Sequence, residues 1–146
     1  MLGRQKAQGV VEFALVLPLL LLLFFGIVYF GFLFSDYLTM NNTVRSVAYD
    51  ASLHTTDEEY RAAIRNNTQN VTLFSDVFIW RPDRQNGTNT DALSVVFDAG
   101  NRDVLVTANA RFNRDNALGY AILNFLGADM GNGINITYRM FTTRTE

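Results

Sequence analysis

The chain has 146 residues, a formal net charge of −2 and a pI near 5.3. This charge argues against nucleic acid as a partner, because binding a phosphate backbone requires clustered Lys and Arg. The absence of cysteine excludes disulfides, thiolate nucleophiles and Cys-based metal sites.

The N-terminal part contains a long apolar segment. Apart from Glu12, residues 10–34 are almost continuously apolar, and the uncharged run 13–34 is close to the roughly 20 residues that cross a bilayer as a helix. A cleaved secretory signal is usually shorter, and the roughly 95 residues that follow could hardly bury so much Leu and Phe. We therefore predict one membrane span at about 13–34, with membrane lipid as its partner.

The residues around and within this segment carry further information. Arg4 and Lys6 precede the span and Asp36 is the first charge after it, which predicts a cytoplasmic N-terminus and an exported C-terminal domain. Pro18 removes one helical hydrogen bond and predicts a bend or local loosening. Glu12 is unfavourable at the mouth of an apolar span unless it reaches the headgroups, is protonated or pairs with a cation.

The string Gln8–Pro18, QGVVEFALVLP, with the Leu-rich run after it, resembles the N-terminal signature of TadE-like proteins of tight-adherence (Flp-type) pilus systems. The resemblance implies that a prepilin peptidase removes a short basic leader and that the glutamate becomes the fifth mature residue. Counting back from Glu12 places the cut between Ala7 and Gln8, so residues 1–7 form the leader. The other motif residues are Gly9, Glu12, Phe13 and Pro18.

One position departs from the family pattern, which has glycine immediately before the cut. This chain has Ala7 there and a glycine two positions later, at Gly9. A cut after Gly9 would make Glu12 the third mature residue, so we favour the cut after Ala7; a retained leader is the remaining alternative. In filaments of this class, the resemblance implies, the carboxylate corresponding to Glu12 pairs with the new N-terminal amine of a neighbouring subunit.

Beyond the span, apolar residues recur at a helical spacing. We expect one long helix over 8–53, roughly 65 to 70 Å long, whose second half docks the exported domain 54–146. Thr56 and Glu59 stand in capping-box spacing and predict a short helix that starts there. His54 lies beside these acids, which we interpret as a cap rather than a metal site. The apolar positions of the long helix's second half are Leu38, Val44, Val47, Ala48 and Ala51.

The rest of the chain reads as strands and turns. Strands are expected over 76–80, 93–98, 104–112 and 134–141, with a hairpin turn at 98–101. Together with a further short helix over 116–126, they predict an α+β fold in which a small antiparallel sheet packs one face against the long helix. We interpret the polar segment 83–91 as a solvated loop rather than a calcium site, since its spacing is not that of an EF-hand. Asn-x-Thr triplets, which are possible glycan acceptors, begin at Asn41, Asn66, Asn70, Asn86 and Asn135.

The C-terminal end supports the resemblance only loosely: Arg139-Met140 and the terminal Arg144-Thr145-Glu146 partly match the family's Met-Arg-Glu-like tail. No paired carboxylates, phosphate-cradling loop or nucleophile constellation is recognisable, so we expect neither an enzyme nor a cofactor. The leading hypothesis is a minor pseudopilin that contacts prepilin peptidase and other pilin subunits. The alternatives are the main repeating subunit of a type IV-like filament, or a single-span adhesin or receptor domain that keeps its leader.

Overall fold

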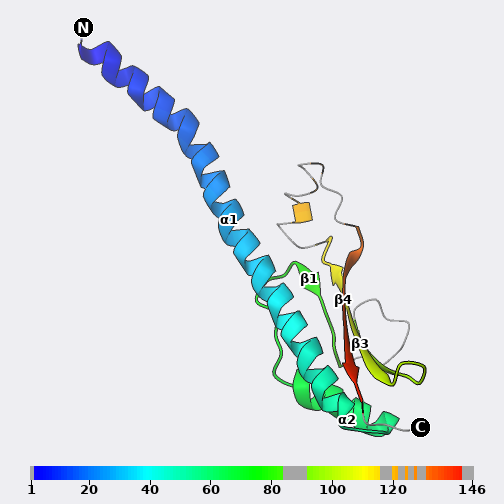
Figure 1. Ribbon diagram of the computed structural model, residues 1–146. Coiled ribbons are helices and arrows are strands. Elements are labelled where there is room, and N and C mark those ends of the chain that lie inside the picture. Colours follow the sequence, from blue (N-terminus) through cyan, green and yellow to red (C-terminus); the bar gives the residue numbers. More distant parts are fainter. Residues whose placement is uncertain are drawn as a thin grey trace. The chain divides into compact units, whose positions relative to one another are not determined.

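The computed structural model describes residues 2–83, 92–115, 120, 121, 124, 127 and 131–142, with side chains from residue 9 onward. The chain divides into two compact units, Met1–Phe34 and Ser35–Glu146. The described part of the first unit is entirely helical, and the second combines helix and antiparallel sheet, which confirms the α+β class. The elements in order are α1 (Leu2–Ser52), α2 (Asp57–Thr68), β1 (Phe78–Ile79), β2 (Leu93–Asp98), β3 (Asp103–Phe112) and β4 (Gly133–Phe141) (Figure 1).

The predicted long helix is confirmed. It ends at Ser52, one residue before the expected end, and continues through Pro18 without interruption. From Ser35 onward, residues three and four apart along α1 are buried, so this half presents one apolar stripe to the sheet. Leu38 was expected on that stripe but is 41% exposed, because it lies about 200° around the helix from the buried Asp36. The buried positions are Asp36, Met40, Thr43, Val44, Val47, Ala48, Ala51 and Ser52.

The helix predicted from the capping-box spacing is α2, and both arms of the box are present. The backbone N–H of Glu59 donates to the Thr56 hydroxyl at 3.3 Å, and the N–H of Thr56 donates to the Glu59 carboxylate at 3.0 Å. These bonds satisfy donors that a helix start otherwise leaves without partners. One face of α2 packs in the core, where its residues Tyr60, Ala63 and Ile64 are buried.

Strand β3 is the centre of an antiparallel sheet. It pairs with β4 along one side over Asp103–Arg111, and along the other side with β2 and then β1. The predicted hairpin is confirmed, with Leu93 opposite Ala108 and Asp98 opposite Asp103. Its turn also holds Arg102 at a φ of 55°, a left-handed conformation that the sequence pattern did not indicate.

The first strand is shorter than expected, since the predicted strand 76–80 forms only the two residues of β1. Its partners are Phe112 and Arg111, because β2 already occupies the same side of β3 from Asp103 to Ala108. The segment is held beyond the ladder by the N–H of Asn113, which donates to the carbonyl of Val77 at 2.7 Å. Competition with β2 therefore limits β1 at its Ile79 end, and the end of β3 at Phe112 limits it at the other.

The two faces of the sheet differ in polarity. Side chains at even positions of β3 and β4 and odd positions of β2 point to the core. The opposite face is mostly polar, apart from Val96, Leu105 and Phe141, and on it Asn135 donates to Asn109 at 2.7 Å. This alternation is the one predicted for a half-buried sheet. At the start of β4, a Cβ on Gly133 would meet the carbonyl oxygen of Ala110 at 2.1 Å, so glycine permits the close approach of β3 and β4.

Some predicted features lie outside the described residues. Positions 84–91 of the loop 83–91 are among them, as is the tail 143–146. Of the helix predicted over 116–126, only residues 120, 121 and 124 are described, and these are helical.

Candidate functional site

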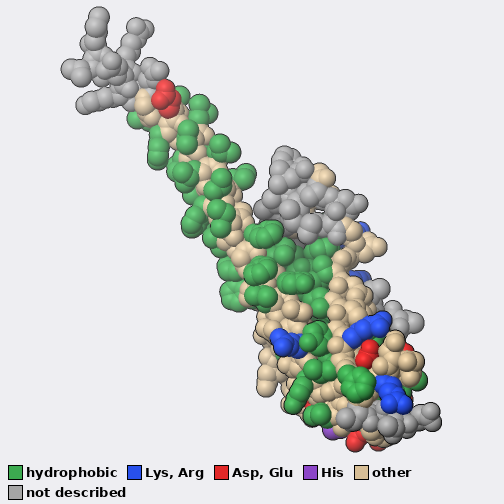
Figure 2. Space-filling view, in the orientation of Figure 1, with side chains coloured by type: hydrophobic (Ala, Val, Ile, Leu, Met, Phe, Trp, Pro, Cys, Tyr) green, Lys and Arg blue, Asp and Glu red, His purple; other side chains and the backbone are tan. Residues whose placement is uncertain are grey.

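The apolar half of α1 has no buried side. From Val10 to Phe34 its large side chains are exposed or half-exposed all around the helix, for example Leu15 at 73% and Phe30 at 66%. Figure 2 shows hydrophobic side chains over the visible face of this segment. Among the described residues one helix is long and apolar enough to cross a membrane, by length and composition. Exposing so many Leu and Phe side chains to water would cost about 1.5–3 kcal/mol each, so this segment requires an apolar environment.

The predicted site residues all lie on this helix. Gly9, Glu12, Phe13 and Pro18 are exposed within α1. Ala7 and Gln8 belong to α1 by backbone conformation, and their side chains lie outside the described residues. Glu12 therefore follows the expected cleavage position by about 6 Å along the helix axis, slightly more than one turn.

The first charge after the apolar segment, Asp36, is fully buried. Its carboxylate accepts hydrogen bonds from the backbone N–H groups of Phe74 at 2.6 Å and Ser75 at 3.0 Å, and from the Ser75 hydroxyl. These donors compensate the desolvation of a buried carboxylate and fix the segment before β1 to the helix. The sequence marked Asp36 only as a flanking charge, and no local pattern indicates a partner nearly forty residues away.

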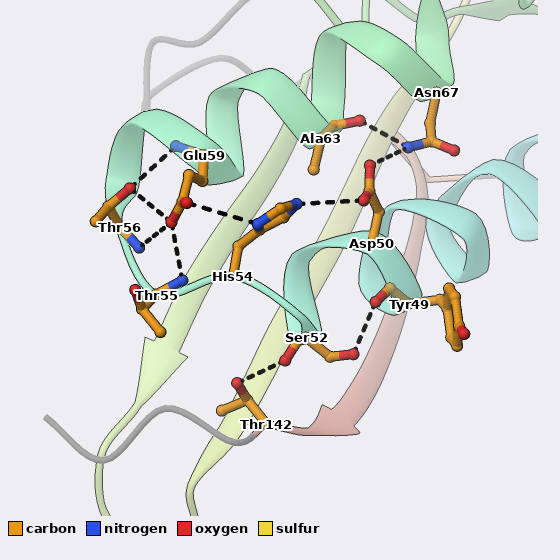
Figure 3. Close-up of polar contacts among 10 residues, drawn as sticks. All are labelled: Tyr49, Asp50, Ser52, His54, Thr55, Thr56, Glu59, Ala63, Asn67 and Thr142. Atoms are coloured by element: carbon orange, nitrogen blue, oxygen red, sulfur yellow. Dashed lines mark hydrogen bonds and ion pairs between the residues drawn. The ribbon is translucent and has the colours of Figure 1, made fainter.

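A second polar cluster joins the end of α1 to α2 (Figure 3). The His54 imidazole lies 3.4 Å from the Asp50 carboxylate and 3.7 Å from the Glu59 carboxylate. Asp50 also accepts a hydrogen bond of 2.9 Å from the Asn67 amide. These contacts fasten α2 to the last turn of α1 and leave the imidazole about one-third exposed.

The donors around the capping carboxylate in this cluster favour its ionised form. The pKa of Glu59 lies below its usual value of 4.5, chiefly because the backbone N–H of Thr55 donates to it and then because the hydroxyl and N–H of Thr56 do. At the hairpin, the Asn101 amide, followed by the N–H of Gly100, similarly lowers the pKa of Asp98.

Comparison with protein families matches residues 7–48 to the family described as TadE-like protein. The match begins at the expected leader boundary, includes the whole string Gln8–Pro18, and ends within the buried stripe of α1. The resemblance drawn from the N-terminal motif is thereby confirmed for this segment. No curated protein and no solved structure matches the chain.

Proposed function

We propose that this chain is a non-enzymatic, pilin-like subunit that takes part in assembly of a tight-adherence type pilus. The observation that carries the proposal is the coincidence of two features in one segment. Residues 7–48 match the TadE-like family, and the same segment contains a helix whose apolar side chains are exposed all around. Such a helix can be surrounded by lipid and later by the helices of other subunits.

In this proposal, the helix spans the membrane with its N-terminus in the cytoplasm. Arg4 and Lys6 lie before the span, and the orientation that keeps them on the cytoplasmic side exports residues 54–146. The buried stripe that begins at Asp36 packs the second half of α1 into the core of the exported domain. Subunit movement from membrane to filament would carry the domain with the helix.

Processing by a prepilin peptidase gives Glu12 its role. Cleavage between Ala7 and Gln8 creates an α-amine, and Glu12 becomes the fifth mature residue. In the apolar interior of a filament, a carboxylate is tolerated when a cation pairs with it. The amine of a neighbouring processed subunit supplies that cation, so an uncleaved chain would lack the partner that assembly requires.

We assign this chain the role of a minor subunit rather than the main repeating one. The main filament subunit of the resembled systems is generally much shorter, whereas this chain adds an α+β domain of about one hundred residues, the size of an ordinary small domain. That domain has its own buried core, formed by the α1 stripe, α2 and the sheet.

Quantification of the protein in sheared pili tests this assignment. Filaments are sheared from cells, separated from membranes and measured by mass spectrometry against the main subunit. A minor subunit is expected in the sheared fraction far below the amount of the main subunit. Comparable amounts would favour the repeating-subunit alternative, and retention in the membrane would favour an anchored receptor or adhesin.

A further inference from the structure

We propose that Asn70 is an N-glycosylation site of the exported domain. The proposal rests on export of residues 54–146, as proposed above. The sugar donor is a glycan carried on a polyprenyl pyrophosphate, and the catalyst is an oligosaccharyltransferase that acts outside the cytoplasm. Asn70 begins one of the five Asn-x-Thr triplets of the chain, and the structure separates this triplet from three of the other four.

Asn-x-Thr triplets are more frequent in this chain than its composition predicts. All 14 Asn and all 13 Thr residues lie in Ser35–Glu146, where Thr accounts for about one residue in nine. Chance would therefore place Thr two positions after only one or two of the Asn residues, and it is found there after five of them. Such a triplet is an acceptor for N-glycosylation when it lies in a surface loop of an exported domain and its middle residue is not proline. None of the five has proline there.

Two of the triplets lie within helices, and the fold already uses their threonines. Thr43 in α1 and Thr68 in α2 are buried, with 6% and 7% of their surface exposed. The Thr43 hydroxyl donates to the carbonyl of Thr39 at 2.8 Å, and the Thr68 hydroxyl donates to the carbonyl of Ile64 at 2.7 Å. An enzyme that recognises the triplet through its hydroxyl would have to open the helix, so these two triplets are not acceptors in the folded domain.

A third triplet lies in strand β4, and its amide is also engaged. The Nδ2 atom of Asn135, to which a glycan would be attached, donates to the Asn109 side chain at 2.7 Å. The Thr137 hydroxyl donates to the Asn135 side chain at 2.9 Å, and the middle residue, Ile136, is buried. Glycosylation there would require β4 to leave the sheet. The triplet that begins at Asn86 lies outside the described residues.

The triplet that begins at Asn70 differs from these three. It follows the end of α2, both Asn70 and Thr72 are exposed, and residues 71–73 belong to no helix or strand. Among the described residues, neither of the two side chains makes a hydrogen bond. An enzyme can therefore reach the amide and the hydroxyl together without opening a helix or a strand.

Backbone contacts hold this triplet on the surface from both sides. On one side, the N–H of Val71 donates to the carbonyl of Thr68 at 3.1 Å. On the other side, the N–H groups of Phe74 and Ser75 donate to the buried Asp36 carboxylate at 2.6 and 3.0 Å. These bonds fix the chain before and after a short exposed loop. The folded domain thus presents the triplet in the kind of surface loop in which such acceptors are found.

The transfer reaction needs no residue of this chain besides the triplet. The Nδ2 atom of Asn70 forms a bond to the anomeric carbon of the glycan, and the bond between that carbon and the pyrophosphate oxygen breaks. The polyprenyl pyrophosphate leaves with the bonding electron pair, and Nδ2 loses one proton to the medium. Nothing is oxidised or reduced, and the glycan adds a bulky, hydrophilic group at the end of α2.

Peptide mass spectrometry of the full-length chain tests the site. The protein is purified from membranes of the cells in which it occurs naturally and is digested with trypsin. The peptide 66–84 contains both Asn66 and Asn70, and fragmentation shows which of them carries added mass. We expect this peptide to carry a glycan on Asn70. Added mass on Asn66 in place of Asn70 would overturn the proposal.

Four variants test the recognition of the triplet. Asn70→Gln and Thr72→Val should abolish the modification, whereas Thr72→Ser should retain it because Ser also completes an acceptor triplet. Asn66→Gln is the matched control, since Asn66 is exposed and begins a triplet in the same peptide. The added mass should persist in that variant. A glycan that remains on the peptide in Asn70→Gln, or that is lost in Asn66→Gln, would overturn the assignment of the site.

Protease treatment of spheroplasts separates this inference from the proposed function. Digestion of residues 54–146 by protease added from outside shows that the domain is exported. If the domain is digested and the peptide 66–84 of the parent chain carries no added mass, the glycosylation site is overturned while the proposed function stands. If the domain is digested only after the membrane is dissolved, it is not exported, and both are overturned.

Discussion

The hydroxyl of Thr142 donates a buried hydrogen bond of 2.8 Å to the backbone carbonyl of Ser52, which joins the end of β4 to the last turn of α1 (Figure 3). The carbonyl of Ser52 belongs to the last residue of the helix and accepts no bond within it. The N–H of Thr142 also donates to the carbonyl of Arg102, so this residue ties the helix, β4 and the hairpin turn together.

We expect Thr142→Val to lower the free energy of unfolding by about 1–2 kcal/mol, because it leaves a buried carbonyl without its donor at nearly constant volume. The measurement is chemical denaturation of the full chain in detergent micelles, followed by Trp80 fluorescence. Thr137→Val is the control, since Thr137 is exposed on the polar face of the sheet. Equal stability of the two variants would show that the Thr142 bond contributes nothing.

Asp36 should contribute more than Thr142 to the free energy of unfolding. Asp36→Ala leaves the N–H groups of Phe74 and Ser75 without an acceptor, so we expect a loss of about 2–4 kcal/mol, with Asp36→Asn intermediate because it keeps one acceptor oxygen. The same denaturation assay measures the loss. Asp76→Asn, at an exposed position nearby, should change stability little. An unchanged Asp36→Ala variant would contradict the anchoring of this loop.

The lowered pKa of the Glu59 carboxylate predicts how the stability of the fold changes with pH. Because the folded-state pKa of Glu59 is lowered, its stabilising effect is present above the unfolded-state value near 4.5 and is lost as the pH falls through the folded-state pKa. The Tm difference between the parent chain and Glu59→Gln should therefore be largest near neutral pH and shrink in acid. Glu58→Gln, in the same helical turn, serves as the control, and an identical profile for both variants would argue against the cap.

Much of the fold could be predicted because its determinants are local. The 3.6-residue spacing and the capping box predicted α1 and α2. Alternation predicted β3 and β4, and a strand-like stretch predicted β2, each to within one residue at each end. The shortening of β1 could not be predicted, because it depends on which strand occupies the edge of β3 and on where β3 ends opposite it. The exposure of Leu38 depends on which side of α1 meets the sheet.

The same distinction applies to the candidate site. The string Gln8–Pro18 is contiguous, so sequence alone indicated the family pattern that the comparison confirms. The cleavage position and the role of Glu12 stay predictions. The anchoring of Phe74 by Asp36 was missed, because a polar contact across 38 positions leaves no periodic signal. The only sequence feature associated with this contact is that Phe74 is an aromatic residue in a segment for which no helix or strand was predicted.

Substitution of Glu12 tests the assembly step. We expect Glu12→Ala to insert into membranes normally and to appear in sheared pili at least roughly tenfold less than the parent chain, because loss of one member of a buried ion pair costs several kcal/mol. Incorporation is quantified by mass spectrometry of sheared material from cells that express equal amounts of each chain. Val11→Ala, the adjacent control, should assemble, and normal incorporation of Glu12→Ala would oppose the amine pairing.

The N-terminal mass of the protein tests the central claim most directly. The chain is isolated from membranes of cells with an active prepilin peptidase and from otherwise identical cells whose peptidase is inactive. We predict a chain that begins at Gln8 in the first sample and one that still carries residues 1–7 in the second. An unprocessed chain in both samples would contradict the assignment as a pilin-like subunit.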